Sequence, residues 1–206
     1  MSQGHPEFDN LVQGMVKLIE KDRLSDLRRD FHTRLRITLN NPDSPNLVDD
    51  LWDFFYDWCI FEEQLPEKIG ASLKDWEKVK GQAQRGLYTI QKIVPKEIKL
   101  KELFSGETVT LEKNDSNEFL GMEKGDIVEG RLLPASDAKH FRFARRPSYH
   151  PHEVHQYIKR KVKQYKKDKD SVTYQNWLWL LVGMYLKHRI YNHMPIEKIY
   201  DDNSRI

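Results

Sequence analysis

The sequence predicts an α+β fold in which helices flank a small, bent antiparallel sheet or half-barrel of about five strands. Between Leu87 and Phe143, apolar and polar residues alternate with the period of two that is typical of strands. Glycine-containing turns separate these runs, and apolar residues at helical spacing fill the sequence on either side. We therefore expect an N-terminal helical part over residues 1–84, a small β unit over 85–146, and C-terminal helices over 147–206 that pack back on it as one compact unit.

The strands predicted within the β unit are short and carry one apolar face. Ile98 and Leu100 alternate with lysines, for example. Ser105-Gly106 and Lys124-Gly125-Asp126 supply turns, because glycine reaches positive φ without a Cβ clash. Gly130, inside a later run, has no side chain to pack, and we expect it to mark a bulge or a sharp bend. Four apolar residues are predicted to point into the core of the sheet: Val109, Leu111, Ile127 and Leu132.

Three main helices are predicted before the sheet. The first is amphipathic and ends near Asp22, and the second, from Leu24 to Leu35, carries arginines that we expect to be solvated. Ser44 caps the third, with Pro45 in its first turn. A shorter helix around Trp76 follows, after a serine and an aspartate spaced as in a capping box, Ser72 and Asp75.

The third helix is both aromatic and acidic. Two neighbouring apolar stripes run along it, so we expect other elements to cover it from at least two sides. Three carboxylates are predicted on its narrow remaining face: Asp50, Asp53 and Asp57.

Two helices are predicted after the sheet. The segment 154–169 has a thin apolar seam and is otherwise basic. The segment from Val172 to about His193 is apolar almost all round, which predicts a helix buried centrally or at a subunit interface.

One stretch of the chain resembles a known group of proteins. The aromatic helix Trp52–Phe61 is followed by the strings Leu103-Phe104-Ser105-Gly106-Glu107-Thr108-Val109 and Gly125-Asp126-Ile127-Val128-Glu129-Gly130-Arg131-Leu132-Leu133-Pro134. In this order, residues 47–146 resemble poorly characterised bacterial proteins, some of which also carry a cysteine-rich SEC-C metal motif. The resemblance implies a bacterial, intracellular protein with a helix-plus-barrel unit, and no activity. Cys59 is the only cysteine, so a cysteine-based zinc site is not carried over.

Composition narrows the class of protein further. Charged residues make up 32% of the 206 residues, and a single cysteine excludes an internal disulfide framework and fits a reducing cytosol. The longest apolar run, from Trp177 to Leu186, is shorter than the roughly 18 residues that a membrane span needs. No secretory signal is visible at the start of the chain. We expect a cytoplasmic protein with no membrane partner.

Charge is distributed unevenly along the chain. Residues 43–63 hold seven carboxylates and no lysine or arginine, whereas residues 139–169 hold eleven basic residues and two acidic ones. The basic segment is therefore the candidate binding surface. Its predicted binding residues are Lys139, Arg142, Arg145, Arg146, Lys159, Arg160, Lys163, Lys166 and Lys167.

Two patterns invite a metal hypothesis. Asp49-Asp50-Leu51-Trp52-Asp53 matches the DDxxD pattern by which isoprenoid synthases hold magnesium, but the β region does not suit such an all-helical enzyme. His150, His152 and His155 lie close together with Glu153, yet their spacing matches no standard zinc motif. We therefore assign no metal, no cofactor and no catalytic residue, and phosphate-binding and nucleophile motifs are also absent.

Three functional hypotheses remain, in order of preference. The first is a non-enzymatic binding or scaffold protein that acts through protein–protein contacts or self-association, with the basic helix docked on the acidic segment 43–63 of its own or a neighbouring chain. The second is a nucleic-acid-binding protein that neutralises phosphates with segment 139–169 and stacks bases on Phe141, Tyr149 or Tyr165. The third is a metal-dependent enzyme that uses the carboxylates of 49–57 or the histidines of 150–155.

Overall fold

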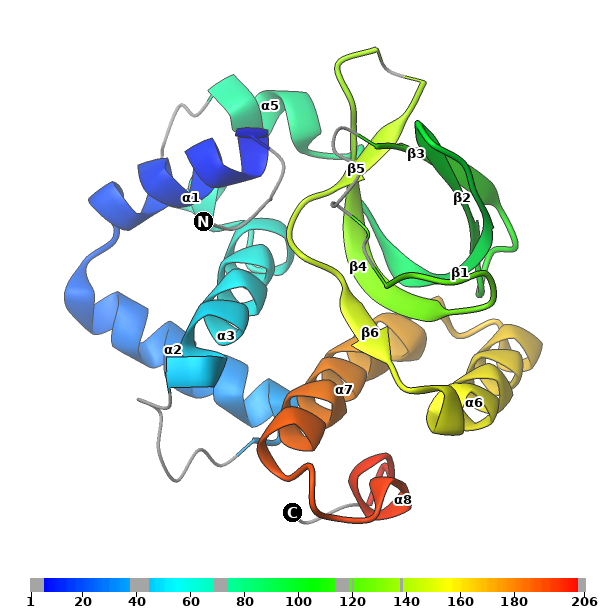
Figure 1. Cartoon of the computed structure of the whole chain (residues 1–206). Coiled ribbons are helices and arrows are strands. Elements are labelled where there is room, and N and C mark those ends of the chain that lie inside the picture. The colour runs from blue at the N-terminus through cyan, green and yellow to red at the C-terminus, as the bar shows by residue number, and fades with distance from the viewer. Residues whose placement is uncertain are drawn as a thin grey trace.

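A computed structural model of the chain describes residues 6–37, 45–68, 74–113, 119, 121–137 and 139–203 (Figure 1). Of Lys21 and of residues 45–50, 74 and 75 it describes the backbone alone. The predicted caps at Ser44, Ser72 and Asp75 therefore lie outside what it describes. The helices before the sheet are α1 (Pro6–Leu18), α2 (Lys21–Leu35), α3 (Pro45–Asp57), the π-helix η1 (Trp58–Glu62), α4 (Leu65–Lys68) and α5 (Lys74–Val79). The strands are β1 (Gln84–Ile93), β2 (Glu97–Glu102), β3 (Thr108–Glu112), β4 (Ile127–Pro134), β5 (Phe141–Phe143) and β6 (Ser148–His150). The helices after the sheet are the 3₁₀-helix η2 (His152–Val154), α6 (His155–Asp168), α7 (Ser171–Ile190) and α8 (Ile196–Ile199).

The sheet closes into a barrel of five strands, with β6 added beside β4. β1 pairs with both β2 and β4, β2 pairs with β3, and β5 pairs with β4, all antiparallel. A parallel contact between β3 and β5, at Leu111 and Phe141, completes the ring. The α+β prediction is confirmed, although the sheet is mixed rather than wholly antiparallel. This strand order has the connectivity of the OB fold, a five-stranded Greek-key barrel.

Glycines shape the barrel at turns and at one crowded position. Gly106 and Gly125 adopt positive φ, of 84° and 99°, at the two predicted turns. The bulge expected at Gly130 was wrong, because Gly130 pairs in register with Gly86, and the register of β1 shifts instead between Ile90 and Lys92. Gly130 is needed for another reason: a Cβ there would lie 2.7 Å from the ring of Phe143.

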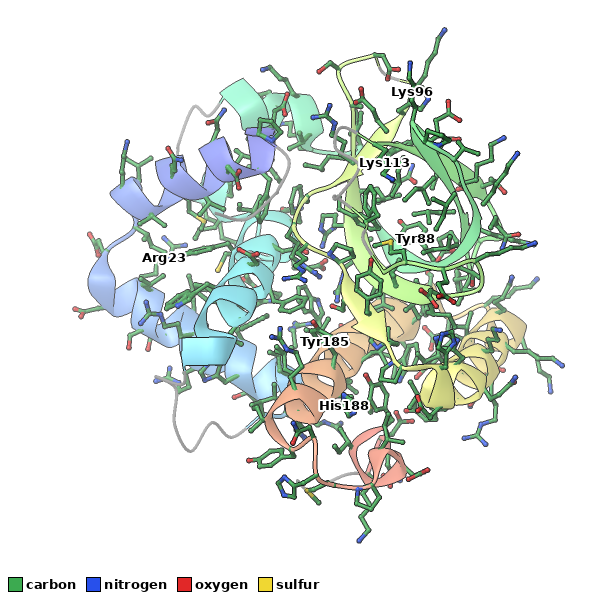
Figure 2. The ribbon with its side chains drawn as sticks, in the orientation of Figure 1. Arg23, Tyr88, Lys96, Lys113, Tyr185 and His188 are labelled. Carbon is green, nitrogen blue, oxygen red and sulfur yellow. The ribbon has the colours of Figure 1, made fainter. Side chains whose placement is uncertain are left out.

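Strand β4 is buried on both faces, which its sequence did not suggest. Val128 and Leu132 point into the barrel with Tyr88 of β1, which Figure 2 shows within the ring of strands. Ile127 and Leu133 lie on the other face, against the helices. The prediction that Ile127 and Leu132 share one core face was therefore wrong, although both are buried. Leu111 is buried inside the barrel, and Val109 is partly buried there.

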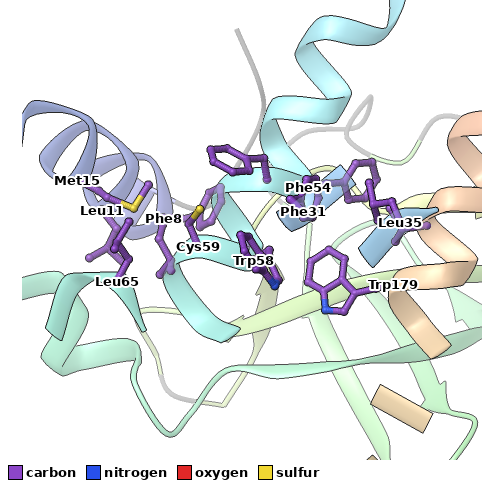
Figure 3. Close-up of a cluster of buried hydrophobic side chains, with 14 of the residues drawn as sticks. Phe8, Leu11, Met15, Phe31, Leu35, Phe54, Trp58, Cys59, Leu65 and Trp179 are labelled. Carbon is purple, nitrogen blue, oxygen red and sulfur yellow. The ribbon is translucent and has the colours of Figure 1, made fainter. Parts of the chain in front are cut away.

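The helices on one side of the barrel form their own apolar core. Figure 3 shows its side chains from α1, α2, α3, η1, α4 and α7, with the buried thiol of Cys59 among them. Helix α7 supplies Trp179 to this core, and its other side packs against α6. It is the centrally buried helix that the sequence predicted. None of the helices in the described part of the chain combines the length and the apolar character needed to cross a bilayer.

The C-terminal segment is fastened to three helices through Asp202. The carboxylate of Asp202 accepts hydrogen bonds from Tyr157 of α6 and Trp177 of α7, and it pairs with Lys161 of α6. Arg36, which follows α2, donates to the carbonyl oxygen of Asp202. The last residues described thus hold α2, α6 and α7 together.

The crossing of α2 and α7 gives a first prediction. A Cβ at Gly183 would overlap the carbonyl oxygen of Leu35, and a backbone atom cannot move aside as a side chain can. We expect Gly183→Ala to lower the free energy of unfolding by about 2–3 kcal/mol or more, as overpacking does. Val172→Ala, at an exposed site of the same helix, should change it by less than about 0.5 kcal/mol. Equal effects of the two substitutions in urea unfolding would contradict the close crossing.

Candidate functional site

A network of buried charges joins the helices to the barrel. Asp57, at the end of α3, accepts from Nε of Arg131 at 2.6 Å and from Nε of Arg145 at 2.8 Å. Glu129 accepts from Nε of Arg85 at 2.9 Å and from Nη2 of Arg145 at 2.9 Å. All five side chains are nearly or wholly inaccessible to solvent. Arg145 therefore bridges one carboxylate of the helical layer and one of strand β4.

The π-helix completes this network. In an α-helix, residues five apart point about 140° away from each other, because each residue turns the helix by about 100°. In η1 the backbone N–H of Glu63 bonds to the carbonyl of Trp58, five residues earlier, so residues at this spacing lie closer to the same side of the helix than in an α-helix. Glu62 consequently reaches Arg131 at 2.7 Å on the same side as Asp57. Three arginines then face three carboxylates.

Electrostatics inside the network favour the charged forms of its two fully buried carboxylates. Burial raises the pKa of Asp57, but Arg131, Arg145 and Arg85 outweigh it and hold that pKa below its ordinary value. Burial likewise raises the pKa of Glu129, and Arg145 and Arg85 again lower it below the ordinary value. Both carboxylates thus remain ionised at neutral pH, and the stability that they contribute is lost as the pH falls from their ordinary pKa values through the depressed ones.

Two predicted positions are corrected by this network. Asp57 was expected on the exposed face of its helix, and it is fully buried because Arg131 and Arg145 neutralise it. Arg145 was expected on the basic binding surface, and it is buried for the same reason, over the ring of Phe54. Asp53 is partly buried beside Arg146, while the side chains of Asp49 and Asp50 lie outside the described residues.

The other predicted binding residues fall at separate places. Arg142 lies in β5 and pairs with Glu112, and Lys139 lies just before that strand. Arg146 is exposed at the edge of a small hollow near Tyr185 of α7. Figure 1 shows β5 and α6 at opposite ends of the barrel. Segment 139–169 therefore does not form one continuous surface.

Helix α6 carries the remaining predicted residues, all of them exposed: Lys159, Arg160, Lys163, Lys166 and Lys167. Within the described residues none of these five takes part in an ion pair. The apolar seam of the helix, with Ile158 and Val162, is buried, so the lysines face outward. Lys159, Lys163 and Lys166 follow one another at helical spacing and share one stripe of the surface.

Two lysines of β2 extend this stripe, and the sequence reasoning missed them as binding residues. Lys166 donates to the carbonyl oxygen of Leu103 at 3.3 Å, which places the end of α6 at the turn after β2. Lys99 and Lys101 are exposed on the outer face of β2, and Lys92 of β1 lies opposite Lys99. We define the basic row as Lys99, Lys101, Lys166, Lys163 and Lys159. The alternation of lysines in β2 predicted the outward direction, but only the fold brings them to α6.

The carboxylates of Glu102, Glu97 and Glu112 do not interrupt the basic row. Glu102 has the same strand phase as Ile98 and Leu100, so it points away from the lysines. Its carboxylate lies over Gly86 and accepts a hydrogen bond from Tyr174 at 2.9 Å. Glu97 and Glu112 stand opposite each other at the far end of the strands, where His140 and Arg142 pair with them.

The three histidines of 150–155 make three different contacts. Nδ1 of His150 lies 3.1 Å from the hydroxyl of Tyr200, and Nε2 of His155 donates to the carbonyl oxygen of His150 at 2.9 Å. His152 is exposed and pairs with Asp126. Across the residues that the structure describes, no group of three or more His, Cys, Asp or Glu side chains is arranged to hold a metal ion.

Comparisons with protein-family models, with curated proteins and with solved structures found no match for this chain. The site must therefore be interpreted from its own geometry.

The buried network predicts a large cost for removing one charge. Asp57→Asn leaves two buried arginines under-neutralised, so we expect the free energy of unfolding to fall by about 3–5 kcal/mol. Glu63→Gln, which removes a carboxylate from a partly exposed pair with Lys68, should cost less than about 1 kcal/mol. Urea unfolding of both variants measures the difference. A loss for Asp57→Asn no larger than that for Glu63→Gln would show that the network does not stabilise the fold.

His150 predicts a loss of stability in mild acid. Burial lowers the pKa of His150 to about 4. Glu129 raises this pKa in part, and His155 lowers it by a smaller amount. Since an unfolded histidine titrates near pH 6.5, the unfolded chain takes up the proton first, and stability falls by about 3 kcal/mol between pH 6.5 and pH 4. His150→Phe keeps a ring beside Tyr185 and Tyr200 and should remove this part of the pH dependence.

Unfolding free energies at pH 7 and pH 4.5 test the prediction. The exposed His193, replaced by Asn, serves as the control for the loss of one surface histidine. If His150→Phe responded to pH just as the parent protein does, the buried neutral state of His150 would be rejected.

Proposed function

We propose that the protein binds nucleic acid through backbone phosphates, without reading sequence, and that the basic row is its contact surface. The observation that supports this is the meeting of α6 with the turn after β2, where Lys166 contacts Leu103. It joins lysines that lie about 60 residues apart in the chain into one exposed group. Lysine contacts to phosphates release counterions, and this is the main source of sequence-independent affinity.

An analogy with the OB fold also supports nucleic-acid binding. In OB folds the outer face of the second and third strands, with the adjoining loops, binds oligonucleotides and oligosaccharides. Here that face carries Lys99, Lys101, Thr108 and Thr110, and the helices cover the opposite side of the barrel, at β1 and β4. Fold alone does not establish function, so the proposal depends on the lysines.

The scaffold hypothesis receives less support from the arrangement of charges. It depends on docking of the basic helix on the acidic segment 43–63. Helix α7 lies between α3 and α6 (Figure 1), and the described ion pairs of the acidic segment go to Arg131, Arg145 and Lys68 instead. Docking on a neighbouring chain stays a hypothesis that the binding test below also addresses.

Charge reversal on α6 tests the proposal. Fluorescence anisotropy with labelled oligonucleotides of mixed sequence should give a Kd in the low micromolar range or below near physiological salt, with affinity falling steeply as salt rises. Replacing Lys159, Lys163 and Lys166 by Glu should weaken binding at least about a hundredfold, because three phosphate contacts become repulsive.

A matched control variant changes the net charge by the same amount at a different place on the surface. Lys17, Arg23 and Arg29 are exposed on α1 and α2, and replacing all three by Glu should alter the affinity less than about threefold beyond the general effect of net charge. Figure 2 shows Arg23 on the side of the molecule away from the barrel. The proposal fails if the parent protein does not bind nucleic acid at low salt, or if the control triple variant loses as much affinity as the α6 variant.

A further inference from the structure

We infer that the nucleic acid bound at the basic row is a single strand, with its bases stacked on a group of aromatic side chains at the middle of the row. The inference rests on the proposed function and names its partner. Its observation is independent of the lysines: Phe104 and Tyr165 are partly exposed and lie beside the contact between β2 and α6.

The aromatic group is built on Tyr174. The ring of Phe104, in the turn after β2, stacks on Tyr174 with centroids 4.5 Å apart and planes 12° apart. Tyr165 of α6 also contacts Tyr174, with centroids 6.2 Å apart and planes tilted by 54°. Tyr174 itself is buried, and its hydroxyl is held by Glu102 and by the backbone N–H of Leu87. Phe104 and Tyr165 are thus rings set on a fixed support.

The position of this group relates it to the lysines. Phe104 follows the residue whose carbonyl Lys166 contacts, and Tyr165 precedes Lys166 in the helix. Lys101 therefore lies before the aromatic group along the row, and Lys163 lies after it. A backbone held by the lysines would pass Phe104 and Tyr165 at its midpoint.

This combination favours a single strand over a duplex. Bases within a duplex are stacked on each other and paired, so their faces are not available to protein side chains. An unpaired strand presents each base face, and stacking on an aromatic ring tolerates any sequence. The basic row is also a single file of charges. It suits one backbone, whereas the two backbones of a duplex are separated by a groove about 12 Å or 6 Å wide.

The length of the row sets the size of the ligand. The lysines of the row span roughly 7 Å of strand β2 and roughly 10 Å of helix α6. This path corresponds to the short end of the roughly 4–16 nucleotides that one OB barrel binds. If five phosphates are neutralised, the logarithm of affinity should fall against the logarithm of salt concentration with a slope of about −3.5.

The experiment compares the full chain with single-stranded and duplex oligonucleotides of the same mixed sequence, in lengths from about 4 to 16 nucleotides. We expect the single strand to bind at least about tenfold more tightly than the duplex, and affinity to stop rising near the length of the row. Phe104→Leu and Tyr165→Leu should each weaken single-strand binding about tenfold, because each removes a stacking surface. Tyr165→Phe, which keeps the ring, should bind as the parent does.

The outcomes separate this inference from the proposed function. Duplex binding as tight as single-strand binding would overturn the inference and leave phosphate binding in place. Loss of affinity in the α6 charge-reversal variant, without any loss in Phe104→Leu and Tyr165→Leu, would also overturn it. The comparison of single strand with duplex uses the unaltered protein, so it holds even if Phe104→Leu impairs folding. Absence of binding to either form would instead reject the proposed function.

Discussion

The sharing of Asp57 and Glu129 by three buried arginines is the interaction on which the rest of the structure depends. Moving a single charge out of water costs several kcal/mol, so each of these groups is stable only when its partners are in place. Asp57 belongs to the helical layer and Glu129 to the barrel, and Arg145 contacts both. The orientation of helices against barrel is therefore specified by ion pairs as well as by apolar packing.

Much of the architecture could be predicted from the local alternation of apolar and polar residues. The errors arise where burial and strand pairing depend on distant parts of the chain. Alternation located β2 and its outward lysines because one face of that strand is solvated. Strand β4 is buried on both faces. The charged residues Glu129 and Arg131 therefore resembled a solvent-exposed face in the sequence, and Ile127 was assigned to the same buried face as Leu132. Barrel closure depends on a parallel contact of the three-residue strand β5, and the alternation at Phe141 and Phe143 does not indicate which strand lies beside it.

The candidate site was half predictable for a similar reason. Exposed lysines on α6 follow from amphipathic spacing alone, but their junction with β2 depends on how α6 packs against α7. A count of charges along the sequence does not distinguish Arg145 from Lys159. Only the structure shows that Arg145 is buried and pairs with buried carboxylates. The resemblance of residues 47–146 to a bacterial group stays a prediction.

The fastening of the chain through Asp202 and α7 has a consequence for the order in which the protein is built. The barrel strands and β6 are continuous in sequence from residue 84 to residue 150, so the ribosome releases all of them before α7 appears. The N-terminal helices emerge earlier still, yet their core requires Trp179, Val182 and Leu186 of α7. Those first helices must therefore wait, with apolar surface uncovered, until α7 has been synthesised. The barrel can form during that interval, and its buried charged side chains can then orient the helices as they dock.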